Sequence, residues 1–246
     1  MHTELMKASG NHLGSDLVAE HPGIGMYAET ALHDELKRMY AANSPEARLE
    51  VRVEGRVVDV VLPDELVEVQ TRSLGSIATK LVNLACVMPI RLVYPVRVRT
   101  IIKRLDGQGR QLSSRTSPKR GDFWSIFDEL VHAPSIVAFP NLRMDAVLVE
   151  VEESRQKDPS WNRRGDKVVT RRLLRVLETR SLDCKAQWLA LLPASLPTPF
   201  DAAALALALG IQAERARKIL YTYRKAGLVL ETEKAGRSKR YIIAPA

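Results

Sequence analysis

The stretch VVDVVLPDELVEVQ, residues 57–70, decides the fold of this chain. Two runs rich in Val and Leu lie on either side of Pro63-Asp64, which is the pattern of a β-hairpin with a short turn. If the residues next to the turn pair with each other, the ladder places Asp59 directly opposite Glu68. The sequence therefore predicts two antiparallel strands that bring two carboxylates together.

The predicted pairing of Asp59 with Glu68 has an electrostatic cost. Opposed residues in an antiparallel pair have Cβ atoms roughly 5 Å apart, and like charges there are destabilising. A divalent cation would turn this repulsion into an attraction, and hard carboxylate oxygens suit Mg²⁺. Gln70 lies on the same face as Glu68, because side chains alternate along a strand. The motif is Asp, eight residues, Glu-x-Gln, and we expect Asp59 and Glu68 to bind Mg²⁺ or Mn²⁺.

The composition is that of a globular protein of one or two domains. The chain has 246 residues, 46% of them apolar and 27% charged. We see neither an apolar run near the ~20 residues of a membrane span nor a signal peptide. Cys86 and Cys184 lie in apolar runs, which predicts buried free thiols in a reducing compartment. We therefore expect a cytoplasmic protein without membrane contact.

A helix is predicted over residues 26–40, where apolar side chains recur at spacings of three and four. Glu29 falls within the apolar stripe, and an acid there is costly unless it is paired or holds a ligand. We therefore include Glu29 among the candidate catalytic residues. The alternative is a carboxylate near the helix start that favours the dipole and reaches solvent. His33 and Lys37 flank the same edge as auxiliary candidates, and His33 fits a core position equally well.

The hairpin lies inside a defined order of elements. We predict a strand over residues 49–54 before it, a helix over 74–88 after it, and a short buried strand over 90–94. The order is thus helix, three-stranded meander, helix, strand. Beyond these elements we expect a hairpin, a helix capped by an Asp, and an apolar strand, at residues 100–114, 122–131 and 144–151.

The order and the motif together resemble the PD-(D/E)xK phosphodiesterase superfamily, which includes many restriction enzymes and Holliday-junction resolvases. Its core is αβββαβ, with Asp on the second strand, Glu-x-Lys on the third and, in many members, a Glu on the first helix. The resemblance covers residues 26–94 and implies metal-dependent cleavage of DNA. It implies that Asp59 and Glu68 hold the metal, that Glu29 contributes, and that Gln70 orients the nucleophile. The flanking segments resemble a family of uncharacterised bacterial proteins, notably at residues 92–95 and 117–121.

One residue departs from the superfamily pattern, because Gln70 stands where the motif has Lys. Some restriction enzymes have Gln at this place and still cleave DNA. A neutral amide stabilises charge less than an ammonium group does, so the metal would have to do more. Lys80, ten residues on in the predicted helix, could reach back to the site. An ordinary solvated lysine is the alternative.

The middle of the chain contains a basic loop and a polar connection. Arg115, Lys119 and Arg120 could touch phosphates, with a solvated loop as the alternative. Residues 156–169 are polar and contain a Pro, which predicts a linker, and residues 170–192 have a helical pattern. The predicted domains are a flexible arm over 1–24, a nuclease-like domain over 25–155, this linker, and a DNA-binding domain over 170–246.

The last 47 residues resemble a winged helix-turn-helix domain. Two helices over residues 201–210 and 212–226 are joined at a Gly, and a basic hairpin follows. Residues 160–246 carry 17 Lys and Arg against 7 Asp and Glu, whereas residues 1–159 carry 20 against 22. This asymmetry favours a polyanionic partner. The DNA-binding candidates on the second helix and the wing are Arg215, Lys218, Thr222, Lys225, Lys234, Arg237, Lys239 and Arg240.

The predicted fold is an α/β PD-(D/E)xK-like αβββαβ core followed by an α+β winged-helix domain. Both parts suit double-stranded DNA, which predicts a metal-dependent endonuclease. A non-catalytic DNA-binding regulator on a degenerate nuclease fold is the main alternative, because the motif lysine is absent. The sequence also leaves open a partner-binding subunit of a larger complex, and a homodimer.

Overall fold

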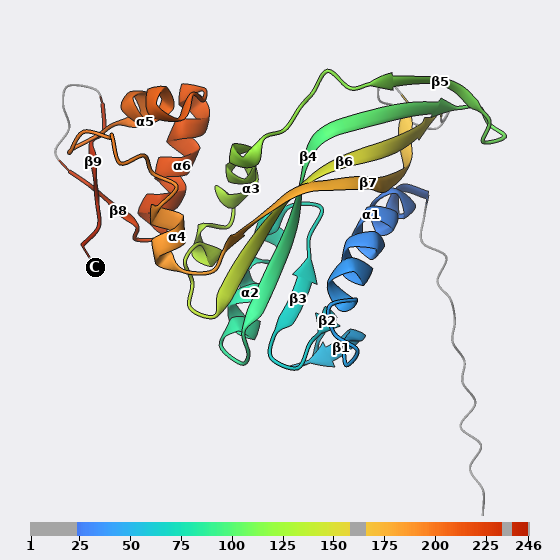
Figure 1. Cartoon of the computed structure of the whole chain (residues 1–246), viewed down its shortest axis with the longest axis horizontal. Helices are drawn as coiled ribbons and strands as arrows, with labels where there is room; N and C mark the ends of the chain where they lie inside the picture. The colour runs from blue at the N-terminus through green and yellow to red at the C-terminus, as the bar shows by residue number, and fades with distance from the viewer. Residues whose placement is uncertain (1–23, 158–165, 233–237, 246) are drawn as a thin grey trace, which may run out of the picture.

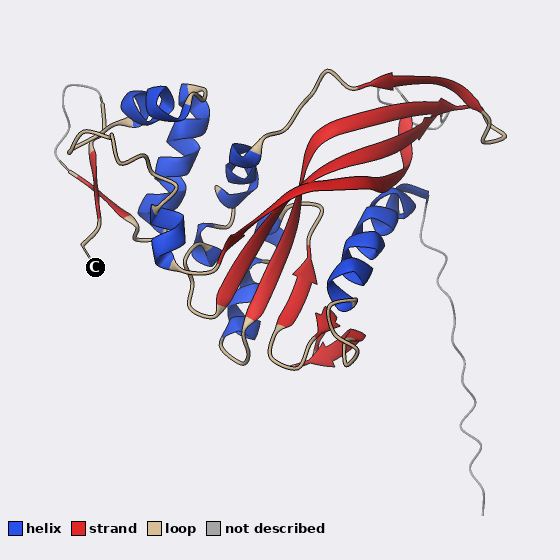
Figure 2. Ribbon diagram, in the orientation of Figure 1, coloured by secondary structure: helices blue, strands red, loops and turns tan. Residues whose placement is uncertain are grey.

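The computed structural model describes residues 24–157, 166–232 and 238–245. Within these residues the protein is a mixed α/β structure. A seven-stranded mixed sheet has helices on both faces, and a two-stranded sheet lies near the C-terminus (Figure 2). The predicted N-terminal arm lies outside the described residues, except for its last residue.

The predicted order of the first half is confirmed. The elements are α1 (Ile24–Ala41), β1 (Arg48–Val53), β2 (Arg56–Val61), β3 (Leu66–Val69), α2 (Ala78–Ala85) and β4 (Ile90–Leu105). Val60 pairs with Val67 across the β2–β3 hairpin, which is the register that the turn predicts. The chain then crosses through a short 3-10 turn and α2 to β4, which pairs in parallel with β3. The second helix is shorter than the predicted 74–88.

Three long strands make the rest of the sheet. β4 pairs in parallel with β6 (Leu142–Gln156), and β6 pairs antiparallel with β7 (Lys167–Leu182). β5 (Gln111–Thr116) pairs only with the far half of β4, where it completes the predicted hairpin. The far half of the sheet extends beyond α2 and α3 and curves away from the C-terminal helices (Figure 1).

The helix predicted over residues 170–192 is wrong, because most of this segment is β7. Leu173 and Val176 both pack toward α1, although a spacing of three should put them on opposite faces of a strand. Bulges in the β6–β7 ladder insert the extra residue that brings them to one face. Leu174 and Leu177 are exposed. The bulges therefore gave the apolar residues of a strand the spacing that is typical of a helix. Because β7 begins at Lys167, part of the predicted linker and of the predicted C-terminal domain belongs to the sheet.

The C-terminal helices and hairpin form as predicted. Asp201 caps α5 (Ala202–Leu209) by accepting a bond from the Ala204 N–H at 2.9 Å, and Gly210 ends it in the left-handed conformation. α6 (Ala213–Lys225) follows, and then β8 (Val229–Glu231) pairs with β9 (Tyr241–Ile243). Gly210 has φ of 64°, a backbone conformation that disfavours side chains with a Cβ.

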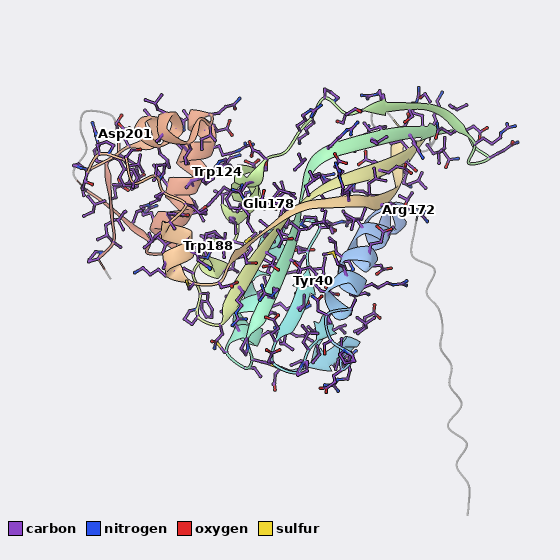
Figure 3. All side chains as sticks on the ribbon, in the orientation of Figure 1. Tyr40, Trp124, Arg172, Glu178, Trp188 and Asp201 are labelled. Atoms are coloured by element: carbon purple, nitrogen blue, oxygen red, sulfur yellow. The ribbon has the colours of Figure 1, made fainter. Side chains whose placement is uncertain are left out.

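Two apolar clusters bury the faces of the sheet. α1 covers one face, with Leu32, Leu36 and Tyr40 against the valines of the central strands. The other face packs against α2, the short helix α3 (Phe127–Leu130), α4 (Lys185–Leu189) and the C-terminal helices. Trp188 lies where these helices meet the sheet (Figure 3), and the Tyr223 hydroxyl donates to its carbonyl at 2.6 Å. The C-terminal helices thus share one core with the sheet.

The two cysteines differ from the prediction. Cys86 and Cys184 are both free thiols, as expected, but both are exposed. Cys184 lies directly before α4 and Cys86 directly after α2, so neither lies inside an apolar helix face. None of the helices in the described ranges is long and apolar enough to span a membrane.

A buried polar network ties α1 to the ends of three strands. Asp145 on β6 is 4% exposed and accepts bonds from the Tyr40 hydroxyl at 2.6 Å and the Ser181 hydroxyl at 2.7 Å. The Arg91 guanidinium donates to Asp145 at 2.8 Å and to Glu65 at 3.0 Å. A buried charge is tolerated when such partners satisfy it. The network therefore fixes the position of α1 on the sheet.

We predict that Asp145→Ala lowers the free energy of unfolding by about 3–5 kcal/mol, because it leaves two hydroxyl groups without their partner and removes one of the carboxylates that balance the Arg91 charge. Urea unfolding followed by circular dichroism measures this. The exposed pair of Glu178 with Arg180 on β7 supplies the control, since Glu178→Gln should change stability by less than about 0.5 kcal/mol. A loss below about 1 kcal/mol in Asp145→Ala would contradict the network's role.

Candidate functional site

The β2–β3 hairpin brings Asp59 and Glu68 together, as the sequence predicts. The Asp59 carboxylate accepts a bond from the Val69 N–H at 2.8 Å, which fixes it across the end of β3. Glu68 is 7% exposed, on the face of β3 that α2 covers. The negative charge of Asp59 contributes to a raised pKa of Glu68, which reflects their proximity.

Lys80 is the third member of the site. It extends from α2, and its Nζ lies 2.5 Å from Oε1 of Glu68. The second carboxylate oxygen, Oε2, is buried and has no hydrogen-bond partner among the described residues. A buried carboxylate oxygen without a partner is costly. Lys80 therefore neutralises Oε1 of Glu68, whereas no described residue forms a hydrogen bond with Oε2.

The two carboxylates have opposite pKa shifts. Burial and the charge of Asp59 raise the pKa of Glu68, and Lys80 together with the Asp59 backbone N–H only partly offsets them. Burial also acts to raise the pKa of Asp59, but the His33 bond, the Val69 N–H and the Lys80 charge outweigh it, so the pKa is lowered. Asp59 is thus the more firmly ionised of the pair, and Glu68 is the group that an added cation would stabilise most.

α1 reaches the site through His33. Its Nε2 lies 3.1 Å from Oδ2 of Asp59, and this bond raises the histidine pKa against the effect of burial. Lys37 is directed elsewhere: it is buried and bonds Glu50 of β1 at 2.6 Å. Glu29 lies on α1 one turn before His33, but its side chain is outside the described part of the structure, so its role stays a prediction.

Gln70 does not contact Glu68. Its amide donates to the Ser73 carbonyl at 3.1 Å, in the turn that leads to α2. Sequence reasoning named Lys80 only as an auxiliary residue, whereas the structure places it directly on Glu68. The short turn after β3 explains this, because it returns α2 across the face on which Glu68 lies.

The donor set suits a hard cation that keeps much of its own water. In the described ranges there is no group of three or more His, Cys, Asp or Glu side chains that could hold a metal. Mg²⁺ is often bound by only one or two carboxylates, with water completing its octahedron. The unpartnered Oε2 of Glu68 and the ionised Asp59 fit that requirement. A structural zinc site would need four protein ligands.

One of the DNA-binding residues predicted on α6 needs correction, and two others form ion pairs. Thr222 is fully buried, so it cannot contact a ligand. Arg215 bonds Asp122 at 3.1 Å, and Lys218 bonds Asp128 at 2.9 Å. These two cations therefore join α6 to the α3 region, although their side chains stay 29% and 32% exposed. The sequence of α6 did not reveal that α3 packs against the helix beside these residues.

The remaining candidates lie on or near the wing. Lys225 is exposed, Lys239 bonds Glu231 at 3.0 Å, and Arg240 lies 3.9 Å from the Asp201 carboxylate. Lys234 and Arg237 lie outside the described residues.

A different face of α6 is open and cationic. Arg217, Tyr221 and Arg224 recur at spacings of four and three, which puts them on one side of the helix. They line a groove of about 550 Å³ between α5, α6 and β9, together with Lys239. Tyr221 is 40% exposed, with the Lys225 ammonium 6.0 Å from its ring. The spacing of these residues was visible in the sequence, but the side of α6 that packs against α3 was not.

Comparison with known proteins gives a family and a relative. Residues 30–183 match the family model of the domain of unknown function DUF8091. An uncharacterised protein of Treponema pallidum (strain Nichols) is 32% identical over 217 residues, which cover 87% of this chain and 84% of the relative. No solved structure matches. Asp59, Glu68 and Lys80 all lie within the matched region.

We predict that Lys80→Met lowers the free energy of unfolding by about 1–3 kcal/mol at pH 8, because the buried Glu68 charge then faces Asp59 without compensation. Glu68→Gln in the same chain should recover most of that loss, which a double-mutant cycle measures. Lys119→Met, an exposed lysine, is the matched control. Strictly additive effects of the two substitutions would show that Lys80 and Glu68 are not coupled.

Proposed function

The chain belongs to the DUF8091 family, a domain of unknown function, and we propose that it is a metal-dependent endonuclease of the PD-(D/E)xK type that cleaves DNA. The observation that carries the proposal is the cluster of half-buried Asp59, buried Glu68 and half-buried Lys80, with one Glu68 oxygen lacking a partner among the described residues. The order of α1, β1, β2, β3, α2 and β4 supports it, because the superfamily core has the same order and the same two carboxylates.

Asp59 and Glu68 would hold the metal ion. When bound, Mg²⁺ or Mn²⁺ lowers the pKa of a water molecule and offsets charge on the scissile phosphate. The Val69 N–H keeps the Asp59 carboxylate oriented, and His33 at 3.1 Å holds a second bond to it. The hairpin thus supplies two carboxylates whose positions are fixed before substrate binds, which is what efficient catalysis requires.

Lys80 would take the part that the superfamily assigns to the motif lysine. It approaches Glu68 from α2, whereas Gln70 turns away toward Ser73. An ammonium group at this place can hold the attacking water and stabilise charge that develops on the phosphate. The charge that is missing at position 70 is thereby restored from another element.

The α5–α6 pair and the β8–β9 hairpin would serve as a winged helix-turn-helix that binds DNA. Arg217 offers charge for phosphates, Arg224 and Lys239 add two cations that share the single carboxylate of Glu231, and Tyr221 offers a flat surface in the same groove. Arg215 and Lys218 would instead hold this unit against the sheet domain.

A non-catalytic DNA-binding regulator is the second candidate function. The observation that favours it is the engagement of Gln70 with Ser73, together with the close Lys80–Glu68 pair, which could serve only to stabilise the hairpin. On this account the site would not bind a divalent metal ion.

We predict cleavage of at least one substrate in a panel of plasmid, linear, branched and single-stranded DNA with Mg²⁺ or Mn²⁺. Asp59→Asn and Glu68→Gln should abolish it, and Lys80→Met should slow it about 10²–10³-fold, the usual cost of one stabilising group. Gel assays of cleavage, with DNA binding measured in parallel, give the result. Glu178→Gln should cleave at the wild-type rate.

Two outcomes would go against the endonuclease. Wild-type protein that binds DNA but never cleaves it, with either metal, would support the regulator. Cleavage that persists in both Asp59→Asn and Glu68→Gln would place the activity elsewhere or in a contaminant.

We predict that Arg217→Ala weakens DNA binding about tenfold and lowers the slope of log K against log salt by about 0.9, the value for one lost phosphate contact on a duplex. The neighbouring Lys218→Ala is the matched control, because that lysine is bonded to Asp128 and should leave the slope unchanged. Fluorescence anisotropy at several salt concentrations measures both. A larger loss of affinity and salt slope in Lys218→Ala than in Arg217→Ala would mean that the Lys218 face of α6 contacts DNA.

A further inference from the structure

The edge of β4 has a gap between its two neighbours. β3 pairs with β4 as far as Val93, and β5 begins to pair at Ile101. Between these points the chain segment 117–121 runs along the edge, where the Ser117 N–H bonds the Thr100 carbonyl at 2.8 Å and the Gly121 N–H bonds the Arg97 carbonyl at 3.0 Å. A cavity of about 270 Å³ lies here. We call it the β4 notch; its lining includes Tyr94, Arg97, Lys119, Arg120, Glu153 and Arg155.

Gly121 sets the width of the β4 notch. A Cβ on this residue would lie 2.7 Å from the Arg97 carbonyl oxygen, a distance that side chains do not adopt. The segment therefore approaches β4 as closely as a backbone can. This approach holds Lys119 and Arg120 over the notch, although both are exposed residues on a loop.

The wall of the β4 notch has more positive than negative charge. Glu153 is 3% exposed and is shared by three guanidinium groups, those of Arg155 at 2.6 Å, Arg171 at 2.7 Å and Arg97 at 4.0 Å. Burial and the neighbouring Arg171 lower the pKa of Arg97, which reflects this crowding of cations. One carboxylate cannot neutralise three guanidinium groups. The unbalanced charge favours an anion in the notch.

The other acids of the notch are already engaged. Asp128 bonds Lys218 and pairs with Arg215 at 3.4 Å. Glu129 accepts a bond from the Leu74 N–H at 3.3 Å. By contrast, Lys119 and Arg120 form no ion pair with any residue in the described ranges. The charge available to a ligand in the notch is therefore positive.

The β4 notch adjoins the candidate active site. The Gln70 N–H bonds the Val93 carbonyl at 2.9 Å, and Tyr94, the next residue of β4, already lines the notch. Glu129 of the notch contacts the same turn that carries the chain from Gln70 to α2. A polymer bound at Glu68 of β3 could thus continue into the notch by crossing to the neighbouring strand β4.

We propose that the β4 notch binds a backbone phosphate of the nucleic-acid strand, one that flanks the phosphate at Asp59 and Glu68. This proposal rests on the proposed function for the identity of the polymer. Arg97, Lys119 and Arg120 contact the phosphate, and Glu153 offsets the repulsion between Arg97 and the neighbouring Arg155 and Arg171. The notch sets the register of the strand relative to the metal site.

The test is binding of a fluorescent oligonucleotide, single-stranded and duplex, in EDTA, so that no cleavage is needed. The double variant Lys119→Ala/Arg120→Ala should bind about tenfold or more weakly, because each lost bond to a charged group has a large effect. Its salt slope should fall by about 0.7–0.9 for each lost phosphate contact. Both residues are exposed, so the fold should be kept, and Arg97→Met tests the third cation. Arg56→Ala, at an exposed arginine that begins β2, should bind like wild type.

Inorganic phosphate distinguishes a strand phosphate from a free anion. Calorimetric titration of phosphate into wild type and the double variant gives the second arm of the test. Weaker oligonucleotide binding in the double variant supports the proposal. Unchanged oligonucleotide affinity and salt slope overturn the proposal, whatever the phosphate titration gives. If phosphate binding is nevertheless lost in the double variant, the notch is a site for a free anion.

The outcome is independent of the cleavage assay. If the double variant loses oligonucleotide binding but no cleavage is found in any condition, the proposed phosphate site is supported and the proposed endonuclease activity is contradicted. If cleavage depends on Asp59 and Glu68 but the double variant binds and cleaves like wild type, only the notch fails.

Discussion

The approach of two carboxylates across the β2–β3 hairpin is the constraint on which the rest of the structure depends. Asp59 and Glu68 repel each other, and the fold offsets this repulsion with three groups from three elements: the Val69 N–H, His33 of α1 and Lys80 of α2. Both helices are thus tied to the hairpin by electrostatics as well as by apolar packing. The compensation is incomplete, because Oε2 of Glu68 keeps no partner among the described residues.

Such incomplete compensation is the observation on which the proposed metal site rests. A structural pair is stable only when the remaining oxygen atoms and protons are also satisfied. Here the raised pKa of Glu68 and its unpartnered oxygen indicate an environment that a divalent cation would complete. In the β4 notch the uncompensated charge is positive, because three guanidinium groups share the single carboxylate of Glu153. The two sites lie on neighbouring strands, β3 and β4, so one polymeric anion with a metal ion would satisfy both.

The parts of the fold that local chemistry determines could be predicted from the sequence. The turn at Pro63-Asp64 set the hairpin register, and Asp201 and Gly210 marked the ends of α5. The prediction failed at β7, where bulges changed the spacing of its apolar residues. It was incomplete at the site, because the bond of Gln70 to Ser73 and the reach of Lys80 depend on how tightly the chain turns after β3. The orientation of α6 depends on its contact with α3, a surface distant in sequence.

Diffraction from crystals grown with Mn²⁺, recorded at the manganese absorption edge, would locate a metal ion at the hairpin. We expect one anomalous peak between Asp59 and Glu68, with Oε2 of Glu68 among the ligands and Lys80 still beside the site. That peak should vanish in Glu68→Gln crystals grown under the same conditions. No peak at saturating Mn²⁺, with Lys80 and Glu68 paired as they are here, would contradict the account and leave the cluster as a stabilising ion pair.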